Sequence, residues 1–160
     1  MTAMTGTLLD DLYREILLDH YRQPRNHNGI DAPTCSADGS NPLCGDQIRV
    51  EVAIDGDRLT GISFSGSGCS ISQASASMMT EYVKGRSAED ARKGIDAFQQ
   101  MMVTAESPGI EGFDDIEALI GVAKFPARVK CASLGWKTLE QALAGEGGAV
   151  TTDERSVEHA

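Results

Sequence analysis

The stretch QIRVEVAIDGDRLTGISFSG, residues 47–66, decides the fold of this chain. On either side of its centre, apolar residues alternate with polar ones, and this period of two is typical of a strand with one buried face. The central DGD favours a tight hairpin turn. A turn centred on residues 56 and 57 places Cys44 opposite Cys69, and a turn one residue earlier places it opposite Ser67. Both registers bring two thiols to the same end of the hairpin.

Helical patterns flank the hairpin on both sides. Apolar spacing and capping signals predict helices over residues 8–22, 70–85, 87–102, 114–123 and 126–145. Ser70 and Gln73 match a capping box, which places Cys69 just before a helix N-terminus, where exposed N–H groups favour a thiolate. Residues 25–43 are rich in Gly, Pro, Asn and Asp without periodicity, so we expect a long loop there.

Composition narrows the class of protein. With 160 residues, 41% of them hydrophobic and 24% charged, the chain suits a single globular domain. Its 24 acidic and 14 basic side chains give a net charge of -10, which disfavours nucleic acid and anionic lipid as partners. The start has no basic region of a secretory signal and no apolar run spans a bilayer, so we expect a cytoplasmic protein. We expect residues 1–6 and 146–160 to be disordered around a domain at 7–145.

The four cysteines are the candidate metal ligands or redox thiols of this sequence. In a reducing compartment, metal ligands or redox thiols are more common than disulfides. Cys44, Asp46, Cys69 and Cys131 would complete a tetrahedral zinc set, with Cys131 in the opening turns of the last helix. No C-x-x-C spacing supports this set, so ordinary packed cysteines remain an equal interpretation. Cys35 lies in the expected loop and is read as a non-ligand, with a resolving thiol as its alternative role.

The histidines are poor ligand candidates by position. His159 lies in the tail, whereas His20 and His27 lie at the end of the first helix and in the loop beyond it. We expect His20 to interact with the carbonyls at the helix C-terminus. No histidine is presented as a base for a cysteine hydrolase.

Four stretches together resemble the SufU branch of the IscU/NifU-like iron–sulfur cluster assembly proteins: LLDHYRQPRN (17–26), NPLCGD (41–46), GSGCSISQASASMM (66–79) and FPARVKCASLGWKTLEQAL (125–143). The resemblance covers nearly all of residues 8–145. It implies an α/β (α+β) fold in which several helices pack on a small three-stranded antiparallel sheet. It also implies a zinc site at one end of that sheet, made by Cys44, Asp46, Cys69 and Cys131.

The function implied by the resemblance is sulfur transfer in the SUF system. In that family picture Cys44 accepts sulfur from the persulfide of a PLP-dependent cysteine desulfurase, SufS, and passes it to the SufB-containing scaffold complex. Such a carrier is a sulfurtransferase that acts only with its desulfurase. Zinc suits this chemistry, because it keeps sulfur deprotonated at neutral pH and a persulfide is attacked by a thiolate. Arg128 and Lys130 would be cations beside the anionic site, or simply solvated surface charges.

Two alternatives remain. An IscU-like scaffold would assemble a transient [2Fe-2S] cluster, and three cysteines and an aspartate can hold iron as well as zinc. IscU proteins carry a histidine directly before the last cysteine, whereas this chain has Lys130, and its spacer between Cys69 and Cys131 is longer. The second alternative is a regulatory protein that activates the desulfurase without carrying sulfur, with a structural zinc.

Overall fold

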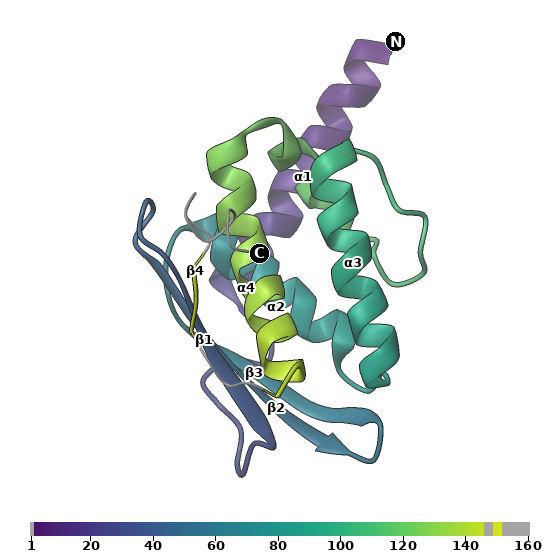
Figure 1. Ribbon diagram of the computed structural model, residues 1–160. Helices are drawn as coiled ribbons and strands as arrows, with labels where there is room; N and C mark the ends of the chain where they lie inside the picture. The colour runs from purple at the N-terminus through teal and green to yellow at the C-terminus, as the bar shows by residue number, and fades with distance from the viewer. Residues whose placement is uncertain (1, 146–148, 152–160) are drawn as a thin grey trace.

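The fold is built on a small sheet. The computed structural model describes residues 2–145 and 149–151, with side chains described for 11–145. The strands are β1 (Cys35–Asn41), β2 (Asp46–Asp55), β3 (Arg58–Ser67) and β4 (Ala149–Thr151), in the order β3-β2-β1-β4. The first three are antiparallel, and β4 pairs parallel to β1. The helices cover one face of the sheet (Figure 1). The expected three-stranded antiparallel sheet with packed helices is confirmed.

The predicted hairpin is present, with one irregularity. Asp55 pairs with Arg58, as expected for a turn centred on residues 56 and 57. A bulge between Ala53 and Ile54 then shifts the register by one residue, because an extra residue on one strand displaces all later pairs. Cys44 therefore has no place opposite Cys69 in the ladder. It lies in the turn at 42–45, where its N–H donates to Asn41 O at 3.2 Å.

β1 lies inside the stretch that we expected to be a loop, and that prediction was wrong. Its inward-facing residues are Ala37, Gly39 and Asn41, which carry almost no hydrophobic signal. Small residues are needed there because α4 (Pro126–Leu143) lies directly on the strand, and a methyl group on Gly39 would clash with Thr138 Oγ1. A strand whose inward residues are small, so that a helix can pack closely on it, lacks the alternating large apolar residues by which strands are predicted.

The helices are α1 (Thr2–Arg22), α2 (Ser70–Val83), α3 (Ala88–Thr104), the 3-10 helix η1 (Ile116–Lys124) and α4. α2 and α4 contact the sheet, while α1 packs on α2, and α3 packs on α4. Phe98 of α3 stacks on Trp136 of α4 with ring centroids 4.4 Å apart, in the middle of the core. None of the described helices combines the length and apolar character needed to cross a membrane.

Several boundaries differ from the prediction. α1 begins at Thr2 rather than near residue 8, since extending an existing helix costs far less than nucleating one. Cys69, not Ser70, is the N-cap of α2. Residues 149–151, expected to be disordered, form β4, because the edge of β1 offers unpaired backbone groups. The rest of the expected tail, 146–148 and 152–160, lies outside the described residues, as does residue 1, and the domain limits at 7 and 145 stay a prediction.

Candidate metal centre

Three of the four expected ligand residues meet at one end of the sheet. Cys44 comes from the turn after β1, Asp46 from the first position of β2, and Cys131 from the second turn of α4. Their two sulfurs and one carboxylate oxygen lie within 4.8 Å of one another. The Sγ atoms of Cys44 and Cys131 are 3.0 Å apart. Residues 87 positions apart in sequence thus become direct neighbours.

Cys69 joins this group through Asp46 rather than through Cys44. As the N-cap of α2, its backbone N–H donates to Asp46 Oδ1 at 2.8 Å, and its Sγ lies 3.9 Å from Asp46 Oδ2. Its sulfur also accepts the Ser72 N–H at 3.5 Å, one of the free N–H groups of the helix start. All four predicted residues therefore gather at one place, with the Asp46 carboxylate holding Cys69 in position.

The site is buried on one side and open on the other. Asp46 and Cys131 are each 1% exposed, Cys69 is half-buried and Cys44 is exposed. Behind Cys131, Asn41 donates from Nδ2 to Sγ at 3.6 Å, while its Oδ1 is a buried oxygen without a partner among the described side chains. Cys44 is the most exposed of the four cysteines.

Electrostatics makes this donor set suitable for a cation. Burial raises the pKa of the Cys131 thiol, and the hydrogen bond to Cys44 and the negative charges of Cys69 and Asp46 raise it further. Deprotonating three thiols beside a carboxylate gathers several negative charges in one place, and a bound metal ion would offset them. Three sulfurs and one oxygen also form a donor set that zinc and iron accept. The residues present therefore fit the metal that the sequence resemblance implies.

Cys35 stays away from this centre, as expected. It begins β1 opposite Val52, whereas the metal-ligand candidates lie at the other end of that strand. Burial raises the pKa of the Cys35 thiol, so it is a poor nucleophile. All four cysteines lie within the described range and are free.

The two cations considered near the site lie in the first turns of α4. Arg128 is exposed and borders a groove with Tyr13, Leu17 and Ile71. Lys130 is half-buried and borders a different hollow between α3 and α4. Their contribution to the site stays a prediction.

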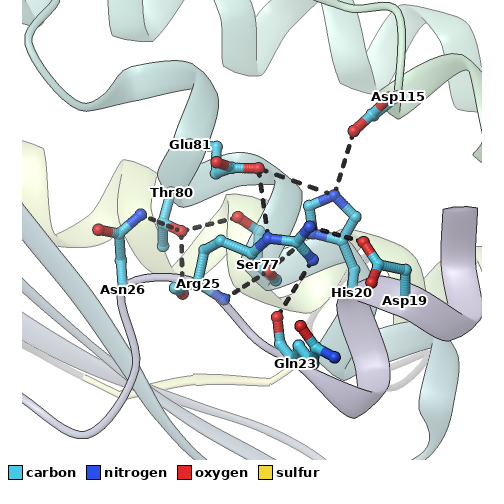
Figure 2. Close-up of polar contacts among 9 residues, drawn as sticks. All are labelled: Asp19, His20, Gln23, Arg25, Asn26, Ser77, Thr80, Glu81 and Asp115. Carbon is cyan, nitrogen blue, oxygen red and sulfur yellow. Dashed lines mark hydrogen bonds and ion pairs between the residues drawn. The ribbon is translucent and has the colours of Figure 1, made fainter.

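The prediction for His20 was wrong. Instead of reaching carbonyls at the end of α1, its ring is buried and contacts the side chains of Ser77 and Asp115 (Figure 2). The signal was available in the spacing, because Ile16 and His20 are one helical turn apart and Ile16 packs against the core. A histidine on the apolar stripe of a helix points inward.

Comparisons with known proteins identify relatives of the chain. The chain is 49% identical to the zinc-dependent sulfurtransferase SufU of Bacillus subtilis over 88% of its length and 95% of the relative's. It is 38% identical to the iron–sulfur cluster assembly scaffold protein IscU of Streptococcus pyogenes, with 96% of both chains covered.

Solved structures share the fold. The crystal structure of FiSufU from Fervidobacterium islandicum AW-1 matches with a TM-score of 0.75 and 33% identity, over 81% of this chain and 94% of that one. The family described as NifU-like N terminal domain matches residues 12–145. The chain belongs to this NifU-like N-terminal domain family, the family of the iron–sulfur cluster assembly proteins SufU and IscU.

Proposed function

We propose that this chain is a zinc-dependent sulfur carrier of SUF iron–sulfur cluster assembly, with Cys44 as the residue that carries sulfur. The observation that supports Cys44 most directly is its exposure, since Cys131 beside it is buried and Cys69 is half-buried. A sulfur acceptor must be reached by a donor from another protein. The similarity to a zinc-dependent sulfurtransferase over almost the full length supports the same conclusion.

The transfer balances without an added oxidant or reductant. The Cys44 thiolate attacks the terminal sulfur of a persulfide on a cysteine desulfurase, and a new S–S bond forms on Cys44. The S–S bond of the donor breaks, and its electron pair leaves with the donor's cysteine as a thiolate. The carried sulfur keeps its oxidation state, and a second exchange of the same kind passes it to the acceptor.

The chain's own residues prepare Cys44 for this attack. Zinc bound by Cys44, Asp46, Cys69 and Cys131 would supply the stabilisation of thiolate over thiol at neutral pH. Cys131 contacts the Cys44 sulfur from the buried side, so the exposed side remains open. The short turn at 42–45 holds Cys44 at the surface, with Leu43 exposed beside it.

The partners in this proposal are a PLP-dependent cysteine desulfurase, SufS, as donor and a SufB-containing scaffold complex as acceptor. The proposal places the chain in the cytoplasm. Arg128 and Lys130 are proposed to offset negative charge near the site when a partner docks.

The test compares Cys44→Ala with Cys35→Ala in a mixture with desulfurase and radiolabelled cysteine. The proposal expects labelled sulfur on the wild-type chain and stimulated desulfurase turnover. Cys44→Ala should lose both, while Cys35→Ala keeps both. If Cys44→Ala still stimulates turnover, the chain is an activator with a structural metal and not a carrier.

A second candidate is an IscU-like scaffold for a transient [2Fe-2S] cluster, which the similarity to the Streptococcus IscU supports. Lys130, where IscU proteins carry a histidine, counts against it. Metal analysis separates the two candidates. About one zinc per chain with little iron favours the carrier, whereas iron with acid-labile sulfide favours the scaffold.

A further inference from the structure

A second group of potential metal ligands lies among the helices, apart from the cysteines. It consists of His20 near the end of α1, Glu81 near the end of α2, and Asp115 just before η1 (Figure 2). His20 Nε2 is 3.2 Å from Asp115 Oδ2 and 3.8 Å from Glu81 Oε1. One nitrogen and two carboxylate oxygens therefore point at a common position, and all three lie within 4.8 Å of one another.

The imidazole of His20 is held as a metal-binding histidine usually is. Its ring is 1% exposed, and Nδ1 lies 2.8 Å from Ser77 Oγ. That hydroxyl oxygen also accepts the backbone N–H of Arg25 at 2.9 Å. In the tautomer whose Nδ1–H donates to Ser77, the lone pair on Nε2 faces two carboxylates, and a cation between them would bind all three groups. Donation from the non-ligating nitrogen to a neighbour is also what fixes the tautomer in known metal sites.

The surroundings favour a cation and let it enter. A cavity of about 310 Å³ opens beside the cluster and is bordered by His20, Glu81, Asp114 and Asp115. Glu81 and Asp115 are 48% and 56% exposed, so an ion reaches them from solvent. Asp115 occupies the N-cap position of η1 but makes no capping hydrogen bond within the described residues, so its carboxylate is turned to His20 and not to the helix start.

Two arginines lie near the cluster, and one of them pairs with Glu81. Arg25 binds Asp19 at 2.6 Å and also forms an ion pair with Glu81, with 3.8 Å between Nε and Oε1. Arg86 places its guanidinium over the Tyr82 ring, 4.2 Å from the centroid, and donates to the backbone oxygen of Tyr82. The cavity is bordered by three carboxylates and by one guanidinium, that of Arg86, so negative charge is in excess there.

We propose that His20, Glu81 and Asp115 form a second cation site, for a divalent first-row metal ion with water completing its shell. One imidazole and two carboxylates suit manganese, ferrous iron or zinc, and differ in kind from the sulfur-rich set around Cys44. Ligands about 2.1 Å from an ion lie roughly 3–3.6 Å apart, so small side-chain movements bring these atoms into place. The inference does not depend on the proposed sulfur transfer.

The test uses manganese, because its preference for oxygen and nitrogen ligands keeps it from the cysteine site. The full chain is first loaded with zinc, and free Mn²⁺ is followed by electron paramagnetic resonance during a titration. We expect one Mn²⁺ per chain, at least about tenfold weaker binding in Glu81→Gln and Asp115→Asn, and unchanged binding in Glu111→Gln. Glu111 is a matched control, because it is an exposed carboxylate outside the cluster.

Further variants and measurements control for misfolding and for binding at the cysteine centre. Both test positions are about half-exposed, so the conservative variants should fold, and circular dichroism checks this. Cys44→Ser should bind Mn²⁺ as the wild type does, which separates this site from the cysteine centre. Bound Mn²⁺ should raise the melting temperature of the wild type but not of Asp115→Asn, since it joins three helices. Absence of Mn²⁺ binding in the wild type, or equal binding in both test variants, would overturn the proposal and leave a hydrogen-bonded cluster.

Discussion

Replacing Gly68 by alanine should weaken the metal centre without touching any ligand residue. A methyl group on Gly68 would clash with Asp46 Oδ1 and lie 2.7 Å from Ser72 Oγ. Asp46 is buried, and the same Oδ1 accepts the Cys69 N–H at 2.8 Å. The carboxylate must therefore turn away, and both the hydrogen bond and the place of Asp46 at the site are lost.

The size of the effect follows from what Asp46 does. A hydrogen bond to a charged group contributes about 1.5–3 kcal/mol. Loss of a group that positions a metal ligand typically costs about 10–100-fold in metal affinity, which corresponds to about 1.4–2.7 kcal/mol. We therefore expect Gly68→Ala to bind zinc at least about tenfold more weakly and to unfold more easily in urea.

Zinc affinity is measured by competition with a chromophoric chelator, and stability by urea denaturation of the metal-free protein. Gly121→Ala is the matched control, because no described atom lies within 4 Å of the methyl group that it adds. Equal zinc affinity for Gly68→Ala and Gly121→Ala would refute the positioning role that we assign to Asp46.

Three further outcomes test the rest of the account. Chelation of zinc should lower the melting temperature by about 5–10 °C, because an ion at a hundred times its Kd adds about 2.7 kcal/mol to folding; an unchanged melt with EDTA would mean a weak or empty site. In metal-free protein, the free energy of unfolding should fall as pH rises through about 9. The unfolded chain releases the Cys131 proton there, while the raised pKa makes the folded chain keep it. Cys131→Ser should flatten this dependence in urea denaturation at several pH values. Phe98→Ala should cost about 3–5 kcal/mol in urea denaturation, whereas Val103→Ala, at an 81% exposed position, should change stability by less than about 0.5 kcal/mol.

The parts of the fold that the sequence predicted are those with a strong periodic signal. β2 and β3 alternate large apolar and polar residues, and α4 begins at Pro126 as its position predicts. β1 was missed because its inward residues are small, which the close packing of Thr138 on Gly39 requires. The bulge at Ala53 could not be read from the sequence, because no local residue pattern marks it.

The candidate site was likewise predicted in part. Cys44 and Cys69 were expected together from the hairpin arithmetic, yet Cys44 contacts Cys131, and Cys69 contacts Asp46. The bulge and the turn at 42–45 account for this change of neighbours. Cys131 was included for its position in the opening turns of the last helix and by the resemblance, but nothing local to α4 relates it to residues 87 positions earlier. Tertiary packing, which brings α4 onto the sheet, was the missing information.

The most direct test of the account mixes the zinc-loaded chain with a cysteine desulfurase and cysteine and then locates persulfide by mass spectrometry. We expect one added sulfur atom on the peptide that contains Cys44, removable by a reductant. The peptides that contain Cys35 and Cys131 should remain unmodified. Persulfide on another cysteine, or none on a chain that still stimulates the desulfurase, would contradict the claim that Cys44 carries sulfur.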